Sequence, residues 1–461
     1  MPTLFDKLFD AHKVVDLGGG TALVAIDRVM LHERTGAAAL NSLATAGRSI
    51  VNPAHVFAVM DHIVDTVPGR GDATRMPGGS AFITETRAAA HKAGITLFDV
   101  TDRDQGITHV ISPELGIVLP GLTLVAPDSH TCTQGAVGAL AWGIGSSEAE
   151  HAMATGTLRV QRPKTMRIRV SGRLREGVTA KDLALHIIAA HGAAGGAGHA
   201  VEYAGEGVSA LPMEARFTLC NMATEFGAFT ALIAPDDETF RYLKGRRFAP
   251  ADWASALAAW QNLHSDPDAH FNADIIIDGT AVRPMVSWGT SPAQSLPIDA
   301  EVPGDEAGAR ARAYMGLIAG QPLQGLPIDA AFIGSCTNSR LSDLQRVAAI
   351  VKGRHVAPGV QAIIVPGSMG VKRAAEAEGL DRIFTNAGFE WRESGCSMCF
   401  FAGGESFGPG ERVVSSTNRN FESRQGPGTR THIASPETVA ASAIAGCIAD
   451  PGRYTEPQTD A

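Results

Sequence analysis

Short apolar runs alternate with longer amphipathic stretches along most of the chain. The runs at 21–26, 96–100 and 122–126 predict buried strands, and the last two lead into acidic loops at Asp102 and Asp128. A helix is predicted over 3–12, with Thr3 as its N-cap and an acidic residue three positions later. These elements indicate an α/β protein rather than a helical bundle or a β-sandwich.

The second half of the chain repeats this alternation. A strand at 165–170 opens a new unit, a helix follows over 180–190, and an Ala/Gly-rich loop occupies 191–199. Strands at 330–334 and 361–366 flank a helix over 341–352. A strand–helix–strand unit of this kind pairs its strands in parallel through a right-handed crossover. The fold class predicted is therefore α/β with parallel-rich sheets.

Two polar stretches without helical or strand periodicity, 263–272 and 297–306, are predicted to be connections. We place domain boundaries near residues 165 and 290. The chain then divides into three segments, 1–165, 166–290 and 291–461, and such a number of domains suits its 461 residues.

Charge and composition argue against several functions. The formal net charge is −9 and no run of Lys or Arg is present, so a nucleic-acid or anionic-membrane surface is not expected. The N-terminus lacks a basic stretch followed by an apolar core, and no apolar run reaches the roughly 18 residues that span a bilayer. We expect a cytoplasmic protein with no membrane association.

The six cysteines favour metal ligands or buried thiols over disulfides in a chain of this kind. Only Cys396 and Cys399 lie close together, and their spacing fits half a zinc site, a redox dithiol or two buried thiols equally well. Cys336 follows a predicted strand directly; taken by itself, it is better explained as a small buried residue. Joined to the pair, it makes three thiolates, one fewer than a structural zinc site or a closed cluster needs. Three thiolates suit a [4Fe–4S] cluster that keeps one iron open to substrate.

Longer motifs surround these cysteines and precede them. They read Ile333-Gly-Ser-Cys-Thr-Asn-Ser-Arg340, Gly395-Cys-Ser-Met-Cys399 and Ser416-Thr-Asn-Arg-Asn-Phe-Glu-Ser-Arg424, with further motifs at 59–62, 106–109, 128–131 and 221–225. Taken in chain order, from the N-terminal helix to the last helix, these motifs resemble those of the aconitase superfamily, and the resemblance covers nearly the whole chain. Within the superfamily, residues 331–435 are most similar to large subunits of bacterial 3-isopropylmalate dehydratases.

The resemblance implies an aconitase-like three-domain core that lacks the family's swivelling domain. It implies that Cys336, Cys396 and Cys399 hold a [4Fe–4S] cluster. The residues that match the family's acid–base groups are Asp61, His62, His109, Asp128, His130 and Glu225. Those that match substrate-binding groups are Ser129, Asn338, Asn418, Arg419 and Arg424. Arginine suits this role because its planar guanidinium grips a carboxylate with two parallel hydrogen bonds.

The implied activity is that of a hydro-lyase acting on a small hydroxy di- or tricarboxylic acid. For the large-subunit group, this is the interconversion of 2- and 3-isopropylmalate in leucine biosynthesis by dehydration and rehydration. The implied partner is a small subunit that carries the swivelling domain and the catalytic serine, so the expected enzyme is a heterodimer.

The sequence departs from this group near the predicted site. Gly403 and Gly404 stand where polar side chains are usual, Ile63 replaces an asparagine, and Pro127 replaces a glycine. We interpret these changes as altered substrate choice or water placement, which makes a paralogue acting on citraconate/2-methylmalate or dimethylmalate the alternative. His32 is expected near the substrate.

Two further classes are disfavoured. The net negative charge of the chain argues against an RNA-binding regulator. A site with three cysteine ligands among acid–base groups argues against an electron carrier, which usually has four ligands to its cluster. The glycine run at 18–20 lacks the G-x-G-x-x-G spacing of a dinucleotide site. The histidines outside the motifs, such as His12, His264 and His270, are expected to face solvent.

Overall fold

The computed structural model describes residues 1–454. The chain divides into two compact units, each assembled from separate stretches of the sequence. Unit 1 consists of Met1–Ile63, Gly78–Arg173 and Ala194–Gly279. Unit 2 consists of Val64–Pro77, Leu174–Ala193 and the described residues from Thr280 on.

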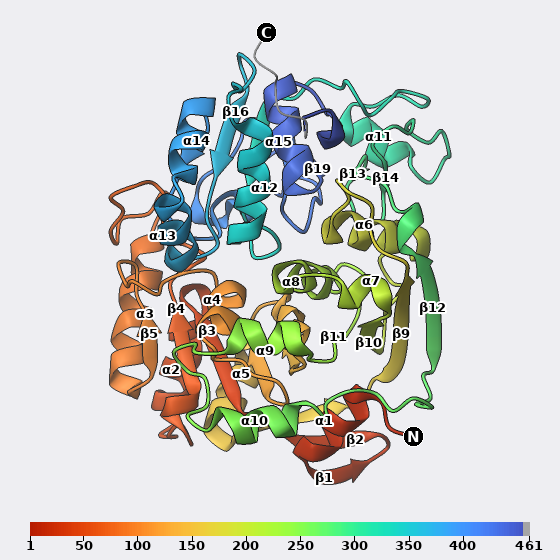
Figure 1. Ribbon diagram of the computed structural model, residues 1–461. Helices are drawn as coiled ribbons and strands as arrows, with labels where there is room; N and C mark the ends of the chain where they lie inside the picture. Colours follow the sequence, from red (N-terminus) through yellow and green to blue (C-terminus); the bar gives the residue numbers. More distant parts are fainter. Residues whose placement is uncertain (455–461) are drawn as a thin grey trace. The chain divides into compact units, whose positions relative to one another are not determined.

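Unit 1 contains a five-stranded parallel sheet with the strand order β5-β4-β3-β6-β7. Its strands are β3 (Arg28–His32), β4 (Val56–Val59), β5 (Thr96–Phe98), β6 (Thr123–Ala126) and β7 (Leu140–Gly143). The helices α2 (Glu33–Thr45), α3 (Gly79–Ala93) and α5 (Ser146–Thr155) pack against this sheet (Figure 1). Every residue of β4 and β6 is buried, which explains why these strands appear in the sequence as unbroken apolar runs.

A second parallel sheet in unit 1 has the order β11-β10-β9-β12. It comprises β9 (Lys164–Ser171), β10 (His199–Ala204), β11 (Thr230–Leu232) and β12 (Ala273–Asp278). A small antiparallel sheet joins β1 (Lys13–Gly18), β2 (Thr21–Ala25) and β8 (Thr157–Gln161). The remaining helices are α1 (Leu4–His12), α4 (Thr108–Glu114), α7 (Glu206–Ser209), α8 (Met213–Met222), α9 (Asp237–Leu243) and α10 (Trp253–Trp260).

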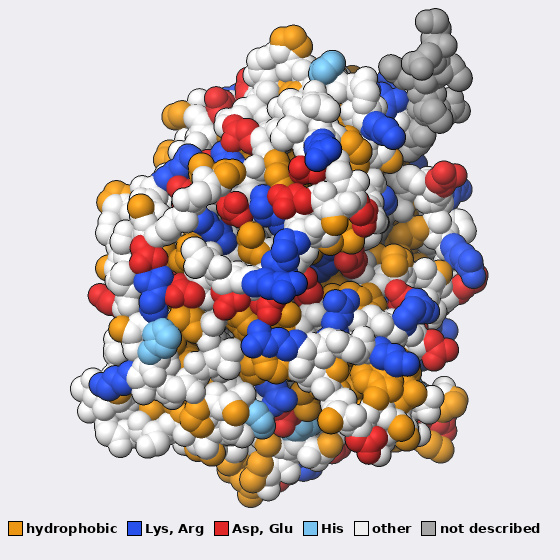
Figure 2. All heavy atoms as spheres, turned by 60° about the vertical axis from the view of Figure 1, so that its left-hand side comes forward, with side chains coloured by type: hydrophobic (Ala, Val, Ile, Leu, Met, Phe, Trp, Pro, Cys, Tyr) orange, Lys and Arg blue, Asp and Glu red, His pale blue; other side chains and the backbone are white. Residues whose placement is uncertain are grey.

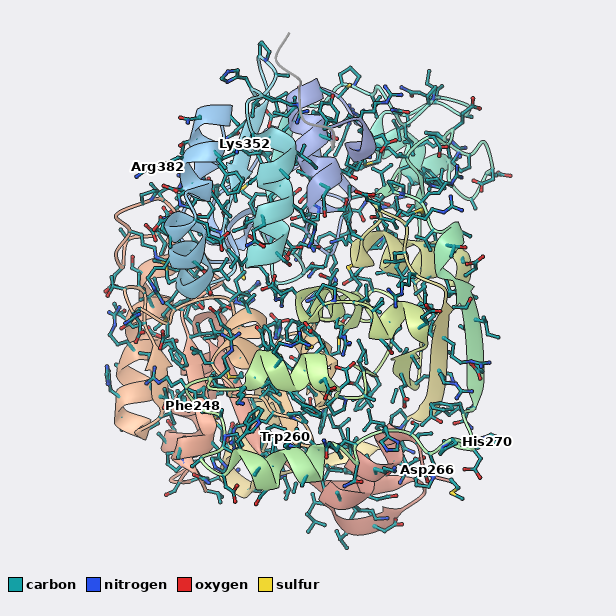
Figure 3. The ribbon with its side chains drawn as sticks, viewed as in Figure 1. Phe248, Trp260, Asp266, His270, Lys352 and Arg382 are labelled. Atoms are coloured by element: carbon teal, nitrogen blue, oxygen red, sulfur yellow. The ribbon has the colours of Figure 1, made fainter. Side chains whose placement is uncertain are left out.

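Aromatic contacts anchor the α10 segment of unit 1. Trp260, at the end of α10, stacks on Phe240 with ring centroids 6.2 Å apart and meets Trp253 edge-on (Figure 3). Phe248, just before the helix, packs edge-on against Phe57 of β4 at 5.4 Å. The segment that connects α9 to α10 is therefore tied to the first sheet by apolar packing.

Unit 2 is built on a five-stranded parallel sheet with the order β17-β16-β15-β18-β19. Its strands are β15 (Ala330–Ile333), β16 (Gln361–Ile364), β17 (Glu390–Trp391), β18 (Arg412–Ser415) and β19 (Arg430–Ile433). Figure 1 shows α12 (Leu341–Val351) between α14 (Leu380–Ala387) and α15 (Pro436–Ala445). The unit also holds α6 (Ala180–His191), α11 (Ala309–Met315), α13 (Met369–Ala377), β13 (Met285–Ser287) and β14 (Ser295–Pro297). The apolar core lies between the sheet and these helices.

The predicted fold class is confirmed. The predicted β15–α12–β16 unit is present with parallel strands, and Thr3 caps α1 in a capping box with Asp6. The predicted strands and helices agree with the observed ones to within two residues, and the loop before β10 begins after His191 as expected. Each of the segments 1–165, 166–290 and 291–461 holds most or all of one parallel sheet. Their division into three domains stays a prediction.

The structure corrects the prediction for one of the three histidines outside the motifs. His264 and His270 are exposed, and Figure 3 shows His270 on the connection before β12. His12 is half-buried instead. Its Nε2 lies 2.9 Å from Asp27 Oδ2 and its Nδ1 lies 2.8 Å from the Leu8 carbonyl. A carboxylate at the end of the neighbouring strand pairs with the imidazole.

Charged side chains of both signs are mixed on the face drawn in Figure 2, where Lys and Arg side chains have Asp and Glu beside them. This mixture agrees with the interspersed charges of the sequence. Among the helices that the structure describes, none combines the length and the apolar character required to cross a bilayer.

A close backbone contact at Gly135 positions the segment that follows β6. Gly135 lies in the 3-10 helix η2 (Thr131–Val137), and a Cβ at this position would stand 1.7 Å from the Ala231 carbonyl oxygen of β11. We expect Gly135→Ala to lower the free energy of unfolding by about 3 kcal/mol, because a backbone oxygen cannot move aside as a side chain can. Thermal unfolding followed by circular dichroism measures this change.

Gly71→Ala is the matched control, since Gly71 is exposed and open space surrounds its Cβ position. It should change stability by less than about 0.5 kcal/mol. Equal effects of the two substitutions would contradict the contact at Gly135.

Candidate active site

In unit 1, the predicted acid–base residues gather at one edge of the first sheet. Asp61 and His62 follow β4, and Asp128 and His130 follow β6. Both strands flank β3 in a parallel arrangement, so their carboxyl ends lie at the same edge, where open α/β sheets bind ligands. His109 enters from the first turn of α4 and Glu225 from the turn after α8.

These side chains form a continuous polar chain. His62 bridges two carboxylates: its Nδ1 contacts Asp61 Oδ1, and its Nε2 lies 3.2 Å from Asp128 Oδ2. Asp128 Oδ1 lies 3.0 Å from His109 Nε2 and accepts the backbone N–H of His130 at 2.8 Å. His130 Nε2 then lies 2.9 Å from Glu225 Oε1. The structure therefore brings together all six residues predicted as acid–base groups.

The two carboxylates beside His62 determine its charge. Burial disfavours the charged imidazole, but Asp61 and Asp128 outweigh burial and raise the pKa of His62 well above 6.5. Burial likewise opposes the charge on Asp128, yet His109 and His62 hold the pKa of Asp128 well below its usual range. At neutral pH, His62 is a cation held between two anions, and it carries a proton that can be donated.

His32, expected near the substrate, lies against this cation. Its ring stacks on His62 with centroids 4.1 Å apart, and its Nε2 lies 3.0 Å from the Pro127 carbonyl oxygen. Burial and the neighbouring His62 charge lower the pKa of His32 to about 4. His32 is therefore neutral at pH 7, and its uncharged ring stacks on the charged ring of His62.

Glu33 is part of this site, although no sequence motif indicated it. Its fully buried carboxylate accepts the backbone N–H groups of Asp61, His62 and Ile63, with the His62 contact at 2.8 Å. Burial and the nearby Asp61 raise the pKa of Glu33. The one available signal was an acidic residue at the start of a helix that directly follows a buried strand. Glu33 holds the loop that presents Asp61 and His62.

We expect Glu33→Ala to leave three backbone N–H groups without their acceptor. The free energy of unfolding should fall by about 3 kcal/mol or more, because an unsatisfied buried donor costs about 1–3 kcal/mol. Circular dichroism of thermal unfolding measures the loss. Glu85→Ala, at an exposed position of α3, is the matched control and should have a negligible effect. A Glu33→Ala protein as stable as the control would contradict this role.

The raised pKa of His62 predicts a pH dependence. Its folded pKa exceeds its unfolded value of 6.5, so its contribution to stability is fully present below 6.5 and is lost as pH rises through the folded pKa. In NMR titrations with isotope-labelled histidine, the His62 signal should have its midpoint above 6.5. Asp61→Asn should lower this midpoint by about one to three pH units. A wild-type midpoint at or below 6.5 would refute the two-carboxylate arrangement.

In unit 2, the predicted metal ligands follow strands of the other parallel sheet. Cys336 lies in the loop after β15. Cys396 precedes the 3-10 helix η4 (Ser397–Cys399), which follows β17, and Cys399 is the last residue of that helix. Asn418 and Arg419 follow β18, which pairs with β15. The same rule of carboxyl ends therefore gathers cysteine and substrate-motif residues at one edge.

Shared neighbours show that Cys336 and Cys399 face the same space. Asn418 Nδ2 donates to Cys336 Sγ at 3.5 Å, and its Oδ1 lies 4.0 Å from Cys399 Sγ. The Ser335 hydroxyl lies 4.0 Å from the first sulfur and 3.4 Å from the second. Arg424 Nη2 donates to Cys399 Sγ at 3.8 Å. Amide and guanidinium N–H donors are therefore directed at these two sulfurs.

Backbone strain is concentrated around these loops. The non-glycine residues with positive φ among those described are Ser335 (90°), Ser339 (139°), Ser397 (45°) and Ser423 (64°). All four lie in the three motifs that carry the cysteines and arginines. Such conformations cost about 1–3 kcal/mol each and persist where function requires a particular loop path. The strain is therefore consistent with loops shaped to present thiols.

The predicted substrate-binding residues are divided between the units. Ser129 lies in unit 1, with its hydroxyl 3.2 Å from His130 Nδ1. The other four lie in unit 2, where the Arg424 guanidinium stands over the rings of Phe400 at 4.6 Å and Phe421 at 5.2 Å. Two rings around a guanidinium limit its orientations and leave its edge available to a carboxylate.

The two-glycine departure from the family pattern has a packing reason at Gly404. Its φ is +86°, and a Cβ there would stand 2.4 Å from the backbone nitrogen of Met76. The next residue, Glu405, forms ion pairs with Arg75 and Arg392 at 2.9 and 2.6 Å. The segment Val64–Pro77 thus lies directly on the loop that follows Cys399, and only glycine fits at the contact.

Comparison with known proteins places these observations in a family. The model of the aconitase family (aconitate hydratase) matches residues 6–446. The chain belongs to the aconitase family. It is 50% identical over 459 residues to the protein named 3-isopropylmalate dehydratase large subunit 1 of Bradyrhizobium diazoefficiens, covering 97% of this chain and 96% of that relative. Among solved structures, it is similar to Thermococcus kodakaraensis aconitase X in its holo-form, at 14% identity and a TM-score of 0.47, over 86% of this chain and 84% of that one.

Family membership confirms the recognition made from the motifs and the predicted class of enzyme. Dehydratases of the aconitase family are generally iron–sulfur enzymes. The donor set of this chain fits such a group, because three cysteines that form no disulfide stand on strained loops, with N–H donors directed at two of their sulfurs.

Proposed function

We propose that the chain is the large subunit of an iron–sulfur hydro-lyase that interconverts 2- and 3-isopropylmalate. The observation that carries this proposal is its 50% identity, over nearly the full length of both chains, to a protein named for that activity. The site chemistry is compatible with it, because elimination of water from a hydroxy acid requires a proton donor, carboxylate binding and a Lewis acid.

In this proposal, Cys336, Cys396 and Cys399 hold a [4Fe–4S] cluster. When bound, the cluster supplies one iron without a protein ligand, a Lewis acid for the substrate hydroxyl and carboxylate. The contacts from Asn418 and Arg424 to the sulfurs support this assignment, since hydrogen bonds to cluster sulfurs adjust the cluster's potential and stability.

The acid–base residues of unit 1 are proposed to manage the proton of the leaving hydroxyl. His62 is the donor, since Asp61 and Asp128 keep it protonated at neutral pH. Asp128 and His109 hold the imidazole from the other side, and the pair His130–Glu225 orders the groups around Ser129. After His62 has donated its proton, the negative charges of Asp61 and Asp128 favour its reprotonation from water.

The arginines of unit 2 are proposed to bind substrate carboxylates, with Asn338 and Asn418 as neutral donors beside them. Arg424 Nε is buried and, among the residues that the structure describes, has no hydrogen-bond partner. A buried N–H without an acceptor is costly, and a carboxylate lying along the Nε edge would satisfy it with two parallel bonds.

The partner proposed is a small subunit carrying the swivelling domain and a serine that removes the proton next to a carboxylate. The support is the relative's description as a large subunit. The cytoplasmic location expected from the sequence belongs to this proposal as well. A paralogous activity on citraconate/2-methylmalate or dimethylmalate is the second candidate, favoured by Gly403, Ile63 and Pro127 near the site.

The test is anaerobic reconstitution followed by an ultraviolet hydration assay with isopropylmaleate, citraconate and dimethylmaleate, with and without the small subunit. We expect turnover only with the small subunit and fastest with isopropylmaleate. A preference for citraconate or dimethylmaleate would establish the second candidate. Turnover by the highly purified chain alone would refute the partner assignment.

Cysteine variants test the metal assignment in the same preparation. Cys336→Ala should abolish the visible absorption of the cluster and reduce turnover by at least about 100-fold, as for loss of a metal ligand. Cys447→Ala is the matched control, because Cys447 lies in unit 2 beyond α15 and outside the three motifs. It should retain both properties. Equal iron content in the two variants would exclude Cys336 as a ligand.

A further inference from the structure

Lys181 is a buried cation to which neither the motifs nor the proposed reaction assigns a role. It lies in the first turn of α6 and its side chain is fully buried. Its ammonium donates to the carbonyl oxygens of Ser416 at 2.8 Å and Thr417 at 2.7 Å. It also donates to Asn338 Oδ1 at 3.4 Å. All of these residues belong to unit 2.

Among the described residues, no carboxylate forms an ion pair with this ammonium. Asp343, the carboxylate with the largest charge interaction with it, is engaged by Arg346 at 2.6 Å and by the backbone N–H of Ser339 at 2.9 Å. The adjacent Asp182 accepts the Met285 N–H at 2.7 Å. Carbonyl dipoles only partly replace the water that the ammonium loses on burial. The positive charge of Lys181 is therefore incompletely compensated.

The groups that hold Lys181 lead directly to the cysteines. Ser416 and Thr417 immediately precede Asn418, whose amide donates to Cys336 Sγ at 3.5 Å. Asn338 follows the same cysteine by two residues and donates to Asp343 at 3.3 Å. The Lys181 ammonium therefore hydrogen-bonds to both loops, the one after β15 and the one after β18.

The charge of Lys181 responds to the same thiols. Burial lowers the pKa of Lys181 to about 7, whereas Asp343, Cys336 and Cys399 act in the opposite direction. Three thiolates around a [4Fe–4S]²⁺ core leave the assembly with a net negative charge. The ammonium would then gain the counter-charge that its surroundings otherwise lack.

We propose that Lys181 is a positioning residue for the cluster: it fixes Asn338 and Asn418 through the two loops and supplies a buried positive charge that offsets the thiolates. This inference rests on the proposed function for the presence of the cluster and goes beyond it in assigning Lys181. Loss of the charge should make the cluster harder to reduce and easier to lose.

The test compares Lys181→Met, which keeps the length and the apolar stem, with Lys181→Arg, which keeps the charge. After anaerobic reconstitution of the full chain, we expect Lys181→Met to lose iron to a chelator about 10-fold faster than wild type or more. Its midpoint potential, from an electron paramagnetic resonance titration, should shift to more negative values. Lys181→Arg should recover most of the potential, because it restores the cation.

Lys352→Met is the matched control, since Lys352 is exposed at the end of α12 (Figure 3). Its iron release and potential should equal those of wild type. Wild-type values in Lys181→Met would overturn the proposal. Failure of apo-Lys181→Met to fold, while apo-Lys181→Arg folds, would also overturn it, since the ammonium would then serve the fold and not the cluster.

The outcomes separate this inference from the proposed function. A wild-type chain that binds the cluster but turns over none of the three substrates would refute the activity. The midpoint potentials of the Lys181 variants would still test the role of Lys181. A wild-type chain that takes up no iron would refute the cofactor assignment and the role of Lys181 together.

Discussion

The parallel pairing of strands is the constraint on which the candidate site depends. In both units, a central strand has parallel neighbours on each side, so the loops at the carboxyl ends open at one edge. Polar residues far apart in sequence, such as Asp61 and Asp128, meet there without a dedicated interaction to bring them together. The buried strands stabilise the sheets, and the short polar loops between strand and helix are left to carry the chemistry.

The two edges handle buried charge in different ways. At the edge in unit 1, charges compensate one another, because His62 stands between two carboxylates and Glu33 is satisfied by three backbone N–H groups. At the edge in unit 2, positive groups lack full compensation: Lys181 has only neutral acceptors, and Arg424 Nε has no acceptor among the described residues. An edge with uncompensated cations is suited to receive anions, whether thiolates around a cluster or the carboxylates of a substrate.

Much of this arrangement was predictable from local patterns and from motifs. The β15–α12–β16 unit and the cap at Thr3 follow from periodicity and capping chemistry, which act over a few residues. Glu33 and Lys181 were not predictable, because their partners lie 28 to 30 and 157 to 236 residues away. A buried ionisable side chain within a helix looks like an ordinary exposed one until the contacts are known. The cysteine spacing alone also left zinc, redox and iron–sulfur sites open, and only the longer motifs decided among them.

Gly404 shows that a departure from a family pattern can have a packing reason that the sequence does not reveal. Its missing side chain reads as a change in the substrate cavity, but the Cβ position is occupied by the backbone of Met76, and glycine is required there for packing. Glu405 keeps a carboxylate on the same loop and uses it for Arg75 and Arg392. The loop after Cys399 is thus held by a backbone contact and two ion pairs. Phe400, on the same loop, lies 4.6 Å from the Arg424 guanidinium, so this loop also borders a predicted substrate-binding group.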